Sequence, residues 1–194
     1  MKQIGITGGI GAGKSIVSKV FKSLGYPVYD ADAAAKWCYT NNVLLKNKVI
    51  ALFGKEAYHA DGSLNRPMLA NQVFQNQERL NQLNAIVHPV VKAHYQAWLK
   101  TNSHSKLVFK EAAILMETAG YKQLDFTILV TAPIELRVNR VVKRDNTTKV
   151  EVESRINKQW SDEQKRPYAN AEIVNDGTTP ILAQLLALEQ QLLQ

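Results

Sequence analysis

Residues 8–15 read GGIGAGKS and follow directly on the apolar segment 4–7. This spacing is that of the G-x-x-x-x-G-K-[ST] phosphate-binding loop, which lies between a buried strand and a helix. Glycines let consecutive backbone N–H groups turn toward phosphate oxygens in conformations that a Cβ atom forbids. The motif constrains the fold strongly, because it requires a strand before it and a helix after it. The alternative is a glycine-rich turn that merely connects two elements.

The two polar residues that end this motif predict how an anion is bound. Lys14 can reach the β- and γ-phosphates of a nucleotide as a point charge, and the Ser15 hydroxyl can hold Mg²⁺. The helix that follows offers unpaired N–H groups and its positive dipole end to the same anion. We therefore expect a nucleoside triphosphate to bind at residues 8–15.

Short β-like runs alternate with helical patterns along the chain, which predicts an α/β fold with a mainly parallel sheet. With the phosphate loop, this indicates the three-layer fold of P-loop NTPases with a five-stranded sheet. The expected strands are residues 3–7, 28–29, 106–110, 126–131 and 172–175. Helical spacing predicts helices over 16–24, 134–144 and 179–193.

Two further segments do not fit the sheet. Residues 33–101 read almost wholly helical, which makes them a candidate acceptor-binding insertion. Pro89 is expected to divide or kink the helical stretch 78–100. Residues 145–170 are dense in alternating charge, which suits a mobile, solvated helical lid more than core. The expected organisation is a nucleotide-binding core of 1–32, 102–144 and 171–194, an insertion of 33–101 and a lid of 145–170.

Composition narrows the class of protein. The chain has 194 residues, 45% of them hydrophobic, which suffices for one core and a small subdomain. Its formal net charge of +7 is spread along the sequence, so it favours phosphate handling over a nucleic-acid module such as a zinc finger. The single cysteine, Cys38, fits a packing residue in a reducing compartment. With no leader and no membrane-length apolar run, we expect a cytoplasmic monomer or weak homo-oligomer without membrane or nucleic-acid partners.

Asp30 and Asp32 follow the expected strand 28–29 at i, i+2 spacing. Ligand-binding groups collect at the carboxyl ends of strands in open α/β sheets. Phosphoryl transfer needs a carboxylate near the γ-phosphate to orient the acceptor hydroxyl. We favour this role for the pair; the alternative is that one of them only caps the helix that begins near Ala33.

Arg137, Arg140 and Arg144 fall at i, i+3 and i+7, so they share one face of the expected helix 134–144. Their guanidinium groups suit planar stacking or bidentate phosphate contact. Alternatively, cations late in a helix only offset its dipole, by roughly 0.3–1 kcal/mol each. Arg155 is either carried in when a lid closes or a solvated surface residue.

Two other polar residues have plain explanations from sequence. His88 precedes Pro89 in an apolar stretch and is interpreted as a structural histidine satisfied by backbone groups. Glu117 ends the apolar run 112–116 and is interpreted as a helix residue of no special role.

Taken together, the motifs resemble those of the dephospho-coenzyme A kinase family over nearly the whole chain. The loop form GITGGIGAGKS, joined to DAD at 30–32, is far more specific than the loop alone. The other matching motifs are Phe53-Gly54, Asp61–Arg66, Ile86–Pro89, the Arg140/Arg144 pair, Arg155-Ile156 with Gln159, and Asn175–Gly177. The chain departs from the family pattern at Ala113, where many members have proline, at Leu136, where many have glutamine, and at Glu172, where aspartate is frequent.

The resemblance implies ATP-dependent, Mg²⁺-assisted phosphorylation of the ribose 3′-hydroxyl of dephospho-coenzyme A. It implies that Asp32 orients or deprotonates this hydroxyl, that Lys14 and Arg140 complete the catalytic set, and that Arg140 packs near the adenine of ATP. The residues implied at the nucleotide are Gly9, Gly11, Ala12, Gly13, Lys14, Ser15, Ile16, Arg140 and Arg144, with Ser15 at the metal. Those implied at the acceptor are Asp32, Arg66, His88 and Arg155.

Two other functions stay open. The first is another P-loop nucleoside or nucleotide kinase with the same core. The second is a P-loop NTPase that binds nucleic acid and uses hydrolysis as a switch. The guanine-recognition tetrapeptide N-K-x-D is missing at residues 157–160, which read NKQW.

Overall fold

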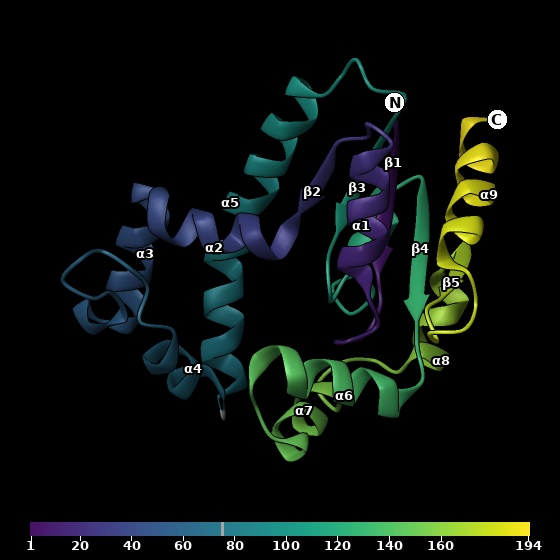
Figure 1. Cartoon of the computed structure of the whole chain (residues 1–194). Coiled ribbons are helices and arrows are strands. Elements are labelled where there is room, and N and C mark those ends of the chain that lie inside the picture. The colour runs from purple at the N-terminus through teal and green to yellow at the C-terminus, as the bar shows by residue number, and fades with distance from the viewer. Residues whose placement is uncertain (75) are drawn as a thin grey trace. The chain divides into compact units, whose positions relative to one another are not determined.

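One sheet of five strands organises one of the two compact units of the protein (Figure 1). The computed structural model describes residues 1–74 and 76–194, and Met1–Asp30 with Thr101–Gln194 form the unit that holds the sheet. The strand order is β2-β3-β1-β4-β5, and every pairing is parallel. The strands are β1 (Lys2–Thr7), β2 (Val28–Asp30), β3 (Leu107–Glu111), β4 (Phe126–Thr131) and β5 (Ala171–Val174). The predicted α/β fold with a parallel five-stranded sheet is confirmed.

The core of this unit includes two helices, α1 (Lys14–Ser23) and α9 (Ile181–Leu193), which contact each other and the sheet. Phe21 of α1 stacks on Phe109 of β3 with ring centroids 4.0 Å apart. The strands read as apolar runs because side chains on both faces of a parallel sheet are covered. Each fully buried Leu, Ile, Val or Phe side chain contributes about 1.5–3 kcal/mol to this packing.

After β4 the chain forms α6 (Ile134–Asp145) and α7 (Lys149–Ile156), which lie side by side (Figure 1). It returns to β5 through two short helices, α8 (Asp162–Lys165) and η3 (Arg166–Tyr168). The side chains of Val152 and Lys165 are fully buried here. The charged segment 145–170 is therefore less solvated than its charge density predicts.

The second unit, Ala31–Lys100, is helical, as the sequence predicts. Its elements are α2 (Ala31–Asn41), α3 (Val43–Phe53), η1 (Lys55–Ala57), α4 (Arg66–Phe74) and α5 (Gln77–Thr101). They enclose an apolar core of their own, formed by Cys38, Leu45, Val49, Phe53, Ala57, Tyr58, Leu69, Leu83 and Val87. The prediction that Cys38 is a packing residue is confirmed, because it is 1% exposed.

Two boundaries in this unit differ from those predicted. The helix expected near Ala33 begins at Ala31, so Asp32 lies within its first turn. Pro89 does not divide α5, which continues to Thr101. A proline removes one helical hydrogen bond, whereas α5 buries apolar side chains on both sides of Pro89, including Leu83 and Leu99. Burial of these side chains outweighs the lost hydrogen bond.

None of the helices in the described part of the chain combines the length and the apolar character that crossing a membrane requires.

Candidate nucleotide-binding site

The glycines of residues 8–15 adopt conformations that other residues resist. Gly11 and Gly13 have φ angles of 79° and 104°. A Cβ atom on Gly11 would lie 2.5 Å from the carbonyl oxygen of Arg137, and one on Gly13 would lie 2.0 Å from Nδ2 of Asn175. The backbone of Arg137 and the side chain of Asn175 therefore pack directly on the loop backbone. Gly13 is also the N-cap of α1 and has no side chain that could accept the first helical N–H groups. The positive end of the helix dipole at this N-terminus favours an anion.

Lys14 is held at the loop. Its Nζ donates to the carbonyl oxygen of Gly8 at 3.0 Å and to that of Gly9 at 3.4 Å. Ser15 and Ile16 follow in the first turn of α1, and both are exposed. The ammonium and hydroxyl groups that the motif predicts thus lie at one end of one helix.

Two arginines of α6 contact the loop from outside. Arg137, which is 4% exposed, donates from Nε to the carbonyl oxygen of Ile10 at 3.0 Å. Arg140 donates from Nη1 to the carbonyl oxygen of Gly11 at 3.4 Å and from Nη2 to that of Asn175 at 3.0 Å. Nδ2 of Asn175 in turn donates to the carbonyl oxygen of Ala12 at 2.8 Å.

The third arginine of the predicted face lies elsewhere. Arg144 pairs with its neighbour Asp145 at 2.7 Å, and its side chain is 61% exposed. Arg155 pairs with the same carboxylate at 2.9 Å. The hydrogen bond from Arg144, together with the nearby charges of both arginines, lowers the pKa of Asp145. Only Arg137 and Arg140 of the predicted face therefore contact the phosphate loop, and Arg144 and Arg155 meet at Asp145.

Carboxylates gather at the carboxyl ends of two neighbouring strands. Asp30 at the end of β2 is in register with Glu111 at the end of β3. Oε2 of Glu111 accepts a hydrogen bond of 2.6 Å from the hydroxyl of Ser18, one turn beyond the loop on α1. Asp32 lies two residues after Asp30, at the start of the helical unit, and is exposed. Glu111 is a residue that sequence reasoning did not select.

The acceptor residues implied by resemblance lie in the helical unit. Arg66 begins α4 and His88 lies on α5; both side chains are exposed. Burial and the neighbouring Tyr58 raise the pKa of Tyr39 to about 12, against an opposing effect of the Arg66 charge. Arg66 therefore acts electrostatically on a partly buried tyrosine of its own unit.

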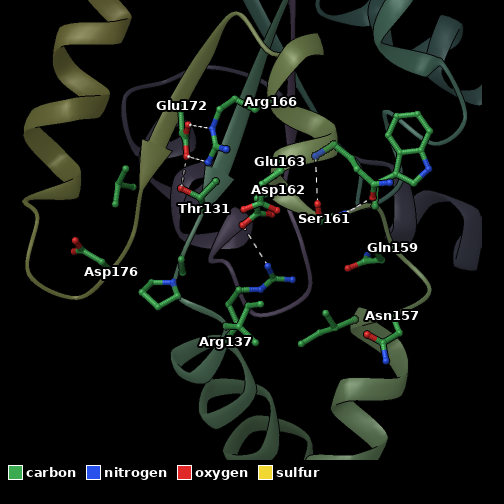
Figure 2. A pocket seen from close by; sticks show the side chains of 17 residues that line it. Thr131, Arg137, Asn157, Gln159, Ser161, Asp162, Glu163, Arg166, Glu172 and Asp176 are labelled. Carbon is green, nitrogen blue, oxygen red and sulfur yellow. Dashed lines mark hydrogen bonds and ion pairs between the residues drawn. The ribbon is translucent and has the colours of Figure 1, made fainter.

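A cavity of about 660 Å³ lies where β4 and β5 approach residues 156–166 (Figure 2). Arg137 reaches Asp162 across it at 3.3 Å. Arg166 binds Glu172 at 2.8 Å, and Glu172 also accepts from the Thr131 hydroxyl at 2.9 Å. Burial raises the pKa of Asp162, whereas the Arg166 hydrogen bond lowers that of Glu172. The polar groups in this wall largely satisfy one another.

The family profile for dephospho-CoA kinase matches residues 2–180. A dephospho-CoA kinase from Bacteroides fragilis strain YCH46 is 38% identical over 186 residues, which is 96% of this chain and 90% of the relative. The chain belongs to the dephospho-CoA kinase family.

Solved structures agree with this assignment. A Thermus thermophilus protein of known crystal structure is 38% identical to this chain, with a TM-score of 0.86. The match covers 98% of this chain and 96% of the Thermus chain. A dephospho-CoA kinase from Campylobacter jejuni is 25% identical, with a TM-score of 0.70, and covers 97% and 95%. Membership of the dephospho-CoA kinase family makes the protein a transferase, and kinases of this kind use ATP.

The donor atoms near the loop fit Mg²⁺ held partly by substrate phosphates better than they fit a metal held by protein side chains alone. No group of three or more His, Cys, Asp or Glu suited to a metal occurs within residues 1–74 and 76–194. Mg²⁺ in kinases is held by few protein oxygens together with substrate phosphates. The exposed Ser15 hydroxyl at the end of the loop fits that donor set.

Sequence reasoning missed several residues that hold this site. Glu117 is not in a helix; its Oε1 accepts from the Trp160 amide at 3.0 Å and lies 3.1 Å from Nζ of Lys165. Asn175 and Gln159 appeared only as parts of family motifs, yet both bind loop backbone. Their type and position in the sequence gave no signal of these contacts, because each partner lies more than 100 residues away along the chain.

Proposed function

We propose that this protein transfers the γ-phosphoryl group of ATP to the ribose 3′-hydroxyl of dephospho-CoA, giving CoA and ADP. The observation that carries this proposal is the phosphate loop with Lys14 hydrogen-bonded to its backbone, in a chain that matches the dephospho-CoA kinase profile over residues 2–180. Phosphoryl transfer depends mainly on positioning and on electrostatic stabilisation of the moving group. A rigid set of amides with one ammonium group supplies both.

In this proposal the chain's own groups bind the nucleotide. The amides of Gly9, Gly11, Ala12, Gly13, Lys14, Ser15 and Ile16 surround the phosphates. Lys14 neutralises charge on the transferring group. Arg140, already bonded to the loop carbonyl of Gly11, lies beside the adenine, and Arg144 supplies a further positive charge. Ser15 holds Mg²⁺, which adds charge neutralisation at the β- and γ-phosphates when bound.

The helical unit takes the acceptor. We assign residues 33–101 to dephospho-CoA binding, with Arg66 and His88 as contacts. Asp32 orients the 3′-hydroxyl and accepts its proton late in the reaction, because loose transition states of this kind demand little early proton removal. We assign residues 145–170 to the lid that excludes water: α7 carries Arg155 toward the substrates on closure, whereas residues 159–165 stay attached to the core.

A comparison of acceptors tests this function. Dephospho-CoA, adenosine and AMP are each offered with Mg-ATP, and ADP release is measured. We expect turnover with dephospho-CoA to exceed that with the other acceptors by at least tenfold. Faster turnover with a nucleoside or monophosphate would instead favour another P-loop kinase.

A gel-shift assay with duplex DNA and single-stranded RNA tests the nucleic-acid alternative. We expect binding only at low salt, since association through net charge alone weakens steeply as salt rises. Retention at physiological salt would favour a nucleic-acid-binding NTPase.

We further propose a cytoplasmic enzyme that is a monomer or weak homo-oligomer. The buried thiol of Cys38 suits a reducing compartment.

A further inference from the structure

Ile10 is fixed at both of its peptide groups by side chains from outside the phosphate loop. Its N–H donates to Oε1 of Gln159 at 2.8 Å. Its carbonyl oxygen accepts from Nε of Arg137 at 3.0 Å. Ile10 lies between Gly9 and Gly11, so the two contacts restrain a glycine-rich segment that has little stiffness of its own.

The segment that carries Gln159 is itself anchored. The amide of the next residue, Trp160, donates to Oε1 of Glu117 at 3.0 Å. Nζ of Lys165, which is fully buried, lies 3.1 Å from the same oxygen. Asp162 binds the guanidinium of Arg137, and Figure 2 shows these two side chains meeting. The segment directly after Gln159 is therefore tied to the rest of the protein at Trp160, Asp162 and Lys165.

A purely local role does not account for Gln159. The turn after α7 is closed by backbone, since the Gln159 N–H donates to the carbonyl oxygen of Ile156 at 3.0 Å. The side chain is not needed for that turn. It extends instead to a residue 149 positions away in sequence. Gln164 offers the contrast, because its side-chain oxygen accepts from the nearby Ser161 amide at 2.9 Å.

We propose that Gln159 is a positioning residue for ATP binding: by accepting the Ile10 N–H, it holds the phosphate loop in the conformation that receives the triphosphate. The inference rests on the proposed function, in which ATP binds at this loop. It also makes nucleotide affinity depend on the segment that follows α7. Loss of the acceptor leaves the Ile10 amide without its protein partner and releases the loop backbone.

The test compares Gln159→Met with the matched control Gln164→Met. Each variant removes one side-chain oxygen that accepts from one backbone amide, in the same segment. We expect Gln159→Met to raise the Mg-ATP dissociation constant, measured by calorimetry, roughly tenfold, which is about 1.4 kcal/mol. The KM for dephospho-CoA should stay within about twofold of the parent, since only nucleotide binding has changed. Gln164→Met should lower Tm and leave ATP affinity at the parent value.

The outcomes separate cleanly. Parent-like ATP affinity in a folded Gln159→Met protein would overturn the inference and leave Gln159 a structural role. If Gln159→Met does not fold, Gln159→Asn replaces it, because its side chain is one methylene too short to reach Ile10; weakened ATP binding supports the inference and parent-like binding overturns it. Failure of the unaltered protein to bind Mg-ATP would refute the proposed function instead.

Discussion

The phosphate loop and the helical unit use their residues in opposite ways. In the loop, backbone groups form the site, and Arg137, Arg140, Asn175 and Gln159 restrain them from outside. In the helical unit, apolar side chains form a core, and the acceptor candidates lie exposed on its surface. A site made of backbone needs a fixed pattern of glycines and is therefore readable from sequence. A site made of surface side chains leaves no such pattern.

The largest expected effect concerns the support behind the loop. Lys165→Met leaves the Glu117 carboxylate, 14% exposed, without its buried cation. Removing one partner of a buried ion pair costs about 3–5 kcal/mol, so we expect the free energy of unfolding in urea to fall by about that amount. The control is Lys149→Met, whose exposed pair with Glu153 spans 3.7 Å and should matter by less than about 1 kcal/mol. Equal losses in both variants would contradict the anchoring role of Lys165.

Lys14→Ala tests the loop itself. We expect turnover to fall about 10²–10³-fold, because the positive charge of Lys14 that stabilises the transferring phosphoryl group is lost. Lys19→Ala, an exposed lysine on the same helix, serves as the control for added helix-surface changes. Near-parent turnover of Lys14→Ala under saturating ATP would remove the loop from the mechanism.

Asp32→Asn tests the point where the helical unit begins. We expect a loss of about 10² in rate, the lower end for a positioned acid–base group, with ATP affinity nearly unchanged. Asp30→Asn is the matched variant two residues earlier and should lose less. A rate for Asp32→Asn equal to that of the parent, or a larger loss for Asp30→Asn, would transfer the role away from Asp32.

Arg66→Ala addresses the surface of the helical unit. Loss of one charge-assisted hydrogen bond should raise the KM for dephospho-CoA roughly tenfold and leave that for ATP unchanged. Lys92→Ala, an exposed lysine on α5, controls for the change in net charge. A rise in the ATP KM with no change for the acceptor would reverse the roles that we propose for the two units.

The smallest effect appears only at alkaline pH. Burial, aided by a hydrogen bond to Glu189, raises the pKa of Tyr26 in the sheet unit to about 12, and burial raises that of Tyr58 in the helical unit to about 12. Unfolded tyrosine ionises near 10. The stability that each protonated tyrosine hydroxyl contributes is therefore present below pH 10 and is lost as the pH rises toward about 12.

Urea unfolding between pH 8 and 11.5 measures this loss. Tyr26→Phe and Tyr58→Phe should each reduce the slope of stability against pH above 10. A slope unchanged by either variant would show that the tyrosine concerned ionises alike in the folded and unfolded states. Different slopes for the two variants would distinguish the two units.

Periodicity and the loop motif were sufficient to predict the parallel sheet, the helical character of residues 33–101 and the packing role of Cys38. They failed where tertiary contacts decide. Charge density predicted that the segment containing Lys165 is exposed to solvent. The Lys165 side chain is instead fully buried and paired with Glu117. Helical spacing placed Arg144 with Arg137 and Arg140, but the adjacent Asp145 binds it. Glu117 has no local pattern, since its partners come from residues 160 and 165.

The central claim is that the loop's nucleotide delivers its phosphoryl group to one particular hydroxyl. Phosphorus-31 NMR of the product formed from dephospho-CoA and Mg-ATP tests this directly. We predict a new phosphomonoester resonance coupled to the ribose 3′ proton, together with one equivalent of ADP. Phosphate attached at another hydroxyl, or inorganic phosphate alone, would contradict the account.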